Sequence, residues 1–306
     1  MALLRKKLAT IGAKAPFPGF VPPELASQVS EPPSGARWIH EIKFDGYRIQ
    51  VQLANAVVKI FTRRGHDWTN RFKKIASDAW NINAGSAIID GEVIVPSATG
   101  ISDFSVLQKE LRGKSNKLVL YAFDLLYLNG YDLRKAPLFE RKAVLRSVIA
   151  QTDVLFSESF ETSGAKTLKQ ACKMGLEGVV SKVRDSRYVS GRTNDWIKVA
   201  CRQRETLPIA GFALDGNKWD GIYLARRRGN ALIYAGKVDH GFTPQDAKHL
   251  RARLTPLVRK TQPYTRKIAH RGIWVDPSVL AEIEYRAKSA EGKLRHPVFK
   301  GIREDL

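Results

Sequence analysis

Segment 41–48 places a lysine where it could carry out covalent chemistry. Lys43 ends a strand-like run and is followed by Asp45, Gly46 and Arg48. A lysine amine is a nucleophile only when it is deprotonated, and its ordinary pKa is about 10.4. Covalent catalysis would therefore require burial or neighbouring cations that lower this pKa. Taken alone, a lysine before an Asp-Gly turn is more simply explained as an exposed surface residue.

Further carboxylates and lysines occur in or beside predicted apolar strands. The charged residues concerned are Asp90, Glu92, Asp124, Glu177, Lys182 and Lys198. Successive side chains of a strand alternate between its two faces, so a lysine flanked by apolar residues points away from the core. These cations could therefore line one concave face and bind an anionic ligand. Each carboxylate taken singly is also explained as a turn or edge residue that pairs with a surface lysine.

Two common phosphate-binding motifs are incomplete in this chain. Residues 113–115 match the end of a P-loop, but Gln108 stands where the motif requires glycine. A protein kinase would use Lys43 as its strand lysine, but no G-x-G-x-x-G precedes it and no H-R-D loop follows it. Both classes are therefore excluded.

The composition indicates a folded protein with an anionic partner. Hydrophobic residues make up 43% of the 306, which excludes a disordered basic tail, and the net charge of +21 is typical of proteins that bind nucleic acid. No apolar run reaches the roughly 20 residues of a membrane span, so we expect no membrane association. Cys172 and Cys201 lie far apart without a Cys-x-x-Cys pair, which argues against a disulfide scaffold or a zinc ribbon and fits a reducing compartment, so we expect a cytoplasmic protein.

We expect an α+β fold of two domains, 1–204 and 205–306. The Pro-rich residues 1–36 predict an extended lead-in. In the first domain, hydrophobic periodicity predicts strands at 38–44, 47–53, 57–61, 87–95, 118–126, 178–182 and 196–199, and helices at 68–79, 104–111, 138–149 and 166–174. In the second it predicts strands at 207–214, 221–228, 231–238 and 279–287, and a helix at 243–254. This pattern suits an OB-type β-barrel, although a sandwich fits it equally well.

Together the motifs resemble those of the covalent nucleotidyltransferase superfamily. Residues 43–46 match its Lys-x-Asp-Gly nucleophile motif, residues 62–65 are similar to its next element, and the charged segments follow in the superfamily's order. Segment 123–130 resembles ATP-dependent DNA ligases. Segment 294–305 narrows the resemblance to the ligase domain of bacterial ligase D, an end-joining ligase that works with Ku. The resemblance implies a nucleotidyltransferase domain followed by an OB-fold domain.

The resemblance also implies a reaction in three steps. Lys43 would attack the α-phosphorus of ATP, forming lysyl-AMP and releasing pyrophosphate. The AMP would pass to a 5′-phosphate at a DNA break, and a 3′-hydroxyl would then displace it. The expected function is thus ATP-dependent DNA sealing in DNA repair or non-homologous end joining.

The same resemblance assigns the nucleotide contacts. Glu41 would lie near the adenine, and Phe123 would stack on the base. Arg48, Arg63 and Glu92 would surround the ribose and its phosphate side. Because stacking tolerates any base, adenine specificity would come from hydrogen bonds to the base edge.

Phosphate and metal contacts are implied in the same way. Lys182 and Lys198 would hold the α-phosphate. Glu177, and less directly Asp45, would bind Mg²⁺ or Mn²⁺, since Mg²⁺ prefers oxygen ligands and phosphate.

The chain departs from the family's pattern near its end. Arg303, with Asp305, resembles the final ligase motif that reaches the departing pyrophosphate, but Leu306 stands where the family often has lysine. Ala200 replaces a second lysine that many ligases carry two residues after Lys198. The length leaves no room for the polymerase and phosphoesterase modules of a full ligase D, so we expect a minimal ligase or a core without its companions.

The expected partners are nicked or broken DNA, with Ku and other end-joining proteins as further candidates. A monomer associated with the bacterial nucleoid would suffice. Two alternatives stay open: an ATP-dependent RNA ligase of the same superfamily, and a non-catalytic OB protein with a degenerate nucleotide site. The second would bind DNA with a steep salt dependence but would form no adenylate.

Overall fold

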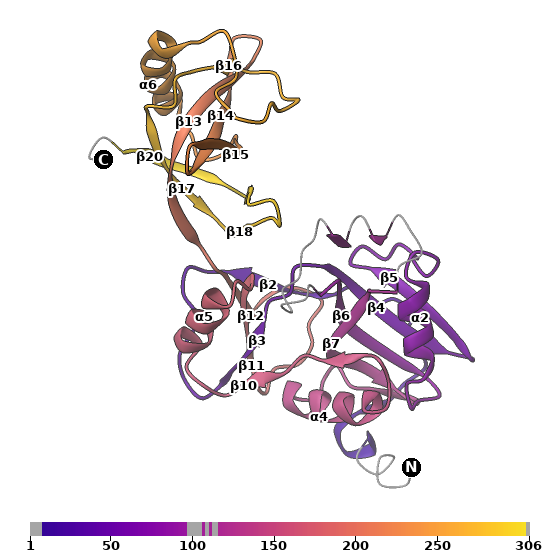
Figure 1. Cartoon of the computed structure of the whole chain (residues 1–306). Coiled ribbons are helices and arrows are strands. Elements are labelled where there is room, and N and C mark those ends of the chain that lie inside the picture. Colours follow the sequence, from indigo (N-terminus) through magenta and orange to yellow (C-terminus); the bar gives the residue numbers. More distant parts are fainter. Residues whose placement is uncertain (1–7, 97–105, 108–109, 112–115, 304–306) are drawn as a thin grey trace. The chain divides into compact units, whose positions relative to one another are not determined.

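The chain divides into two units, Met1–Cys201 and Arg202–Leu306, which are drawn in Figure 1. The computed structural model describes residues 8–96, 106–107, 110–111 and 116–303. Four of the eight residues of the expected helix at 104–111 lie outside the described residues, as do the P-loop-like residues 113–115, Asp305 and Leu306. The boundary between the units falls three residues before the one expected between 204 and 205.

The described part of the first unit contains two β-sheets. The strands of the larger sheet are β1 (Ala13–Lys14), β4 (Tyr47–Ala54), β5 (Val57–Thr62), β6 (Ala87–Ile94), β7 (Val119–Leu128), β8 (Tyr131–Asp132) and β9 (Leu155–Phe156). Their order is β1-β8-β7-β6-β4-β5, and β9 pairs with β7. The strands of the smaller sheet are β2 (Glu24–Gln28), β3 (Trp38–Ile42), β10 (Ser159–Phe160), β11 (Gly178–Val183) and β12 (Gly191–Ala200). Their order is β10-β3-β11-β12-β2.

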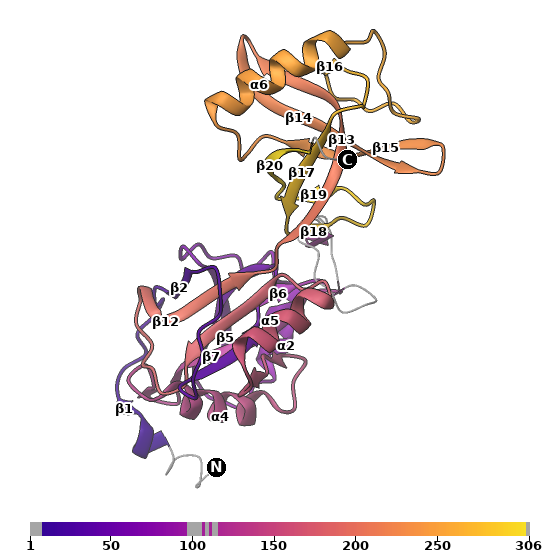
Figure 2. The ribbon, with the colours of Figure 1, turned by 90° about the vertical axis from the view of Figure 1, so that its left-hand side faces the viewer.

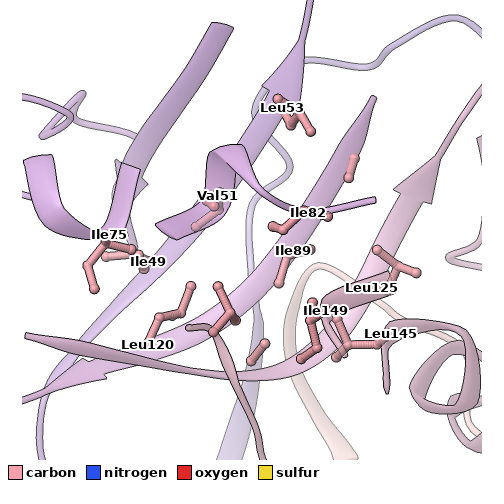
Figure 3. Packing of buried hydrophobic residues seen from close by; sticks show 14 of the residues in the cluster. Ile49, Val51, Leu53, Ile75, Ile82, Ile89, Leu120, Leu125, Leu145 and Ile149 are labelled. Atoms are coloured by element: carbon pink, nitrogen blue, oxygen red, sulfur yellow. The ribbon is translucent and has the colours of Figure 1, made fainter. Parts of the chain in front are cut away.

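Several helices pack on these two sheets. Helix α2 (Lys73–Trp80) contacts β4 and β5, helix α4 (Leu138–Ile149) contacts β7 and β9, and helix α5 (Gly164–Lys173) contacts β3 and β11. Figure 3 shows the core beneath the first two helices, where Ile75 of α2 and Leu145 of α4 lie near apolar side chains of the larger sheet. The predicted helix at 138–149 is therefore confirmed.

Strand alternation separates this core from a polar face. On β4, Ile49 and Val51 enter the core, and on β6 Ile89 does the same. Because neighbours along a strand point to opposite faces, Arg48 and Glu92 lie on the other side of the sheet. A second apolar cluster joins the two sheets and consists of Val21, Ile88, Phe123, Leu126, Tyr127, Tyr188 and Trp196.

Part of the predicted extended lead-in is a strand. Strand β2 pairs in parallel with β12, as Figure 2 shows. Its Glu24 is fully buried and accepts hydrogen bonds from the Thr193 hydroxyl (2.6 Å) and the Val189 amide (3.1 Å). The sequence did not indicate this strand because its partner lies more than 160 residues away and prolines precede it.

The second unit is a β-rich region with one α-helix among its described residues. Its strands are β13 (Gln203–Asp215), β14 (Lys218–Arg228), β15 (Ala231–Val238), β16 (Ile273–Trp274), β17 (Leu280–Tyr285), β18 (Ala287–Lys288), β19 (Leu294–Arg295) and β20 (Val298–Arg303). The main sheet has the order β15-β14-β13-β17-β20, with β16 beside β13; β18 and β19 form a separate pair. Strand β13 pairs with β17 through its first half and with β14 through its second half, as a strand shared around a barrel does.

The helix of the second unit begins where the sequence predicts. Helix α6 (Pro244–Leu254) is followed by a 3₁₀ turn (Thr255–Leu257). The Thr243 hydroxyl accepts a hydrogen bond from the Asp246 amide, and the Asp246 carboxylate accepts one from the Thr243 amide. This reciprocal capping box satisfies two donors at the helix start.

The two cysteines form a pair that the sequence analysis did not indicate. Cys172, on α5, and Cys201, which follows β12, form a disulfide across 29 residues of sequence, with their Cα atoms 5.3 Å apart. The sequence spacing could not show this, because the end of α5 and the residue after β12 come together only in the folded unit. None of the described helices has both the length and the apolar character needed to cross a membrane.

Candidate active site

The two sheets of the first unit enclose a cavity of about 900 Å³. Eight of the ten nucleotide-binding and catalytic residues predicted from the sequence line it: Glu41, Lys43, Arg48, Arg63, Glu92, Phe123, Lys182 and Lys198. Strand β3 supplies Glu41 and precedes Lys43, and the other residues come from or follow β4, β5, β6, β7, β11 and β12. The folded chain thus brings residues spread over more than 150 positions into one cavity.

Lys43 forms an ion pair with Glu177, which precedes β11. The side chains are 20% and 11% exposed, respectively, so the pair is only partly open to solvent. The Lys43 amide donates a hydrogen bond to the Gly178 carbonyl at 2.9 Å, which fixes the end of β3 against the start of β11. The lysine must leave this carboxylate and lose a proton before it can act as a nucleophile.

The cations expected near Lys43 have different partners. Arg48 pairs with Asp90 at 2.6 Å, and Lys182 pairs with Glu41 at 2.9 Å. Lys198 interacts electrostatically with Lys43, Arg192 and Arg63, which also line the cavity. Burial lowers the pKa of Lys198, and the charges of Lys43, Arg192 and Arg63 lower it further. Because these cations repel one another, binding an anion among them is favourable.

Glu41 lies between two buried lysines. Its Oε1 atom is 2.8 Å from Lys142 Nζ, and its Oε2 atom is 2.9 Å from Lys182 Nζ. The Ser157 hydroxyl donates to Oε2 at 3.1 Å. Burial alone would raise the pKa of Glu41, but the charges of Lys142 and Lys182 outweigh burial and lower it. Glu41 is therefore an ionised carboxylate at the floor of the cavity.

Two aromatic rings stand beside this carboxylate. Phe123 and Trp196 pack edge to face, with ring centroids 5.9 Å apart. Lys182 Nζ lies 4.4 Å from the Phe123 centroid and 4.0 Å from the Trp196 centroid, distances at which a cation is attracted to the ring face. The Arg48 guanidinium lies 5.3 Å from the Phe123 ring. The cavity floor therefore joins flat apolar surface to fixed charge, which suits a purine nucleotide.

Arg48 and Glu92 occupy facing positions on β4 and β6. Arg48 makes two hydrogen bonds to Asp90, at 3.0 and 2.6 Å, and Asp90 also accepts one from the Tyr188 hydroxyl at 2.7 Å. Burial raises the pKa of Glu92 to about 8, although the charges of Arg48 and Lys43 oppose this rise. At neutral pH Glu92 is therefore largely protonated in the ligand-free site, where it can both donate and accept hydrogen bonds.

A fully buried ion pair supports the cavity from behind. Arg141 of α4 binds Asp124 of β7 at 2.7 and 2.8 Å, and both side chains are 0% exposed. Arg141 also donates to the Ala136 and Ser186 carbonyls, at 2.6 and 2.9 Å. The pair fastens α4 to the strand that carries Phe123, so it positions the pocket without lining it.

Sequence reasoning did not identify Lys142 and Tyr188 as part of the site. For Lys142 a signal existed: it stands four residues after Leu138 and three before Leu145, in line with two apolar residues of the predicted helix. This spacing marks one face of a helix, so a lysine within it is expected to need a buried partner. For Tyr188 the sequence carried no comparable signal.

Three predicted site residues, Asp45, Glu177 and Arg303, do not line this cavity. Arg303 lies on β20 of the second unit, where it pairs with Glu282 at 3.8 Å. Asp45 follows β3 without lining the cavity, and Glu177 contacts Lys43. Within the described residues there is no group of three or more His, Cys, Asp or Glu side chains that could hold a metal ion.

Comparison with known proteins identifies the family. Residues 23–200 match the family model described as "ATP dependent DNA ligase domain". Residues 215–306 match the model described as "ATP dependent DNA ligase C terminal region". The chain belongs to the ATP-dependent DNA ligase family. Its first unit is thus the adenylation domain, and its second is the OB-like region that this family carries.

Relatives of this ligase include long and short proteins. It is 36% identical to the "Multifunctional non-homologous end joining protein LigD" of Pseudomonas aeruginosa over 96% of the chain, but it spans only 36% of that relative. It is 28% identical to the "SPbeta prophage-derived DNA ligase-like protein LigB" of Bacillus subtilis, covering 93% of the chain and 99% of the relative. The chain is also similar to a solved structure of a mycobacterial DNA ligase D with ATP and MES. The match covers 93% of this chain and 95% of the solved chain, with 28% identity and a TM-score of 0.58.

Proposed function

We propose that this ligase joins 3′-hydroxyl and 5′-phosphate ends of DNA through a lysyl-AMP on Lys43. The observation that carries the proposal is the position of Lys43: it lines a cavity that combines an aromatic floor, a buried carboxylate and several cations. This combination matches the parts of ATP, since the base is flat and apolar and the phosphates are anionic. The mycobacterial ligase D structure, solved with ATP, supports this choice of nucleotide.

Different cavity residues would contact the base, the ribose and the phosphates of the nucleotide. The Glu41 carboxylate can accept a hydrogen bond from the adenine amino group, and Phe123 offers a ring face to the base. Arg48 and Glu92 face each other on adjacent strands and would contact the ribose, with Arg63 beside the sugar-phosphate. Adenine specificity would then come from Glu41, because stacking does not distinguish bases.

The chemical steps follow from the lysines. The deprotonated Lys43 amine would attack the α-phosphorus, forming a P–N bond as the bond to pyrophosphate breaks. Lys182 and Lys198 would stabilise the charge that develops on the non-bridging oxygens. The AMP would then pass to the 5′-phosphate of the DNA, and the 3′-hydroxyl would displace it. Arg303 would contact the departing pyrophosphate.

The carboxylate of Glu177 fits a role in binding Mg²⁺ or Mn²⁺. Mg²⁺ is usually held by one or two carboxylates together with substrate phosphates and water, so a site without three protein ligands among the described residues suits it. Glu177 would supply one oxygen, with Asp45 as a weaker candidate. When bound, the ion would neutralise charge on the phosphates.

The biological setting we propose is DNA repair by non-homologous end joining in a bacterial cytoplasm. The named function of the Pseudomonas relative supports it, and so does the net charge of +21, which suits contacts with DNA phosphates. Ku and other end-joining proteins are the proposed partners, and one monomer would act on one break.

Incubation with α-labelled ATP and Mg²⁺, followed by a denaturing gel, tests the proposal. Wild-type protein should carry covalent label, and Lys43→Ala should carry none. Label on Lys43→Ala, or none on the wild type, would refute it. Nicked DNA and nicked RNA duplexes offered in parallel separate the DNA ligase from an RNA ligase, because the 2′-hydroxyl and A-form geometry distinguish them.

A further inference from the structure

Glu41 and the α-phosphate of ATP would compete for the same cation, Lys182. In the structure Lys182 binds Glu41 Oε2, yet its proposed role is to hold the α-phosphate of ATP. A buried carboxylate that loses its only cation is strongly destabilised, because the remaining charge is neither solvated nor paired. If Lys182 were the single partner of Glu41, ATP would have to compete with that penalty.

Lys142 is placed to remove this competition. Its ammonium binds the other oxygen of Glu41 at 2.8 Å, so the carboxylate keeps one cation when Lys182 leaves. Lys142 also donates to the Ser157 carbonyl at 2.9 Å and to the Phe123 carbonyl at 3.4 Å. These contacts hold its ammonium in place independently of the nucleotide.

The two lysines differ in their access to a ligand. Lys182 lines the nucleotide cavity, between the ring faces of Phe123 and Trp196. Lys142 reaches Glu41 from α4 instead, with its ammonium 4.5 Å from the centroid of the Phe156 ring. Lys182 is thus the cation that can turn to a phosphate, and Lys142 is the one that stays.

We propose that Lys142 is a positioning residue, which neutralises Glu41 and so frees Lys182 for the α-phosphate. The proposal rests on the proposed function, because it assumes that lysyl-AMP forms in this cavity. Lys142 would touch no atom of ATP, and its effect would pass through Glu41 to Lys182. It lies outside every motif that the sequence analysis singled out.

The proposal predicts how the rate of lysyl-AMP formation changes in Lys142→Met, in Glu41→Gln and in the double variant. Lys142→Met should slow lysyl-AMP formation at saturating ATP by about tenfold or more, because all the attraction of Glu41 then falls on Lys182. Glu41→Gln removes that attraction while keeping an oxygen for the adenine amino group. The double variant Glu41→Gln/Lys142→Met should therefore react faster than Lys142→Met alone. A loss of packing would instead make the double variant slower still.

The test is a single-turnover measurement of lysyl-AMP on full-length protein, with urea unfolding to confirm that each variant is folded. Arg146→Met is the matched control: it removes a cation from the same helix, but that cation pairs with the exposed Glu158. It should react at the wild-type rate. If Lys142→Met does not fold, Lys142→Gln replaces it in both the single and the double variant.

The outcomes separate this inference from the proposed function. If the wild type forms no lysyl-AMP, the proposed function fails and the inference falls with it. If the wild type reacts but Lys142→Met is equally fast, or the double variant is no faster than Lys142→Met, the inference is overturned and the proposed function stands. Recovery in the double variant supports a role of Lys142 through Glu41.

Discussion

Replacing Glu92 by glutamine should make the ligase more stable at neutral pH but not in acid. Burial raises the pKa of Glu92 to about 8 from its ordinary value of 4.5. Between these two values the folded protein holds a proton that the unfolded chain has lost. The stability of the wild type must then fall as the pH rises through this range, because the unfolded state binds fewer protons.

The size of the effect follows from the linkage. One full proton of difference is worth about 1.4 kcal/mol per pH unit, so the contribution of Glu92 falls by up to about 3 kcal/mol between pH 5 and pH 7. The amide introduced by Glu92→Gln has the same shape as the carboxyl group and no proton to lose. The difference in unfolding free energy, Glu92→Gln minus wild type, should therefore grow by up to that amount over the same interval.

Urea unfolding at pH 5, 6 and 7, followed by tryptophan fluorescence, measures this difference. Glu158→Gln is the matched control, because it makes the same chemical change at a side chain that is 55% exposed, and the growth with pH for Glu92→Gln should exceed that of this control. A Glu92→Gln difference that stays constant across the three pH values, or that shrinks as the pH rises, would refute the reasoning. Either result would mean that Glu92 is ionised in the folded, ligand-free protein at neutral pH.

Two further predictions concern the free energy of unfolding, measured with urea. Arg141→Met should lower it by about 3–5 kcal/mol, because Asp124 stays charged and buried without its cation. The double variant Asp124→Leu/Arg141→Met should lose less, and an equal or greater loss would contradict this account. Thr243→Ala should cost about 1 kcal/mol, because it removes the side chain that caps α6; Thr255→Ala, at the other end of that helix, is the comparison, and a Thr243→Ala protein as stable as wild type would show that the capping box contributes little.

Most strands of the adenylation domain could be predicted from the sequence, because each carries its own alternating pattern. The pattern along β4 separates Ile49 and Val51 from Arg48, and the structure confirms that separation. Strand β2 could not be predicted in this way. It is short, follows two prolines, and depends on β12, which local sequence does not reveal.

The sequence predicted which residues line the cavity, but not which ion pairs they form. The motifs indicated Lys43, Arg48 and Lys182, and all three line one cavity. Spacing could not show that Arg48 and Lys182 are held by Asp90 and Glu41, since such pairs depend on which strands become neighbours. The disulfide between Cys172 and Cys201 was missed for the same reason.

That disulfide turns part of the adenylation domain into a closed covalent loop. Glu177, Lys182 and Lys198 all lie between the two cysteines, so the loop holds the partner of the nucleophile and both proposed phosphate-binding lysines. A single protease cut inside it would leave the two fragments attached to each other until a reductant opened the bond. Cys201 is also the last residue of the first unit, so the loop tethers the exit of the chain from that unit to α5.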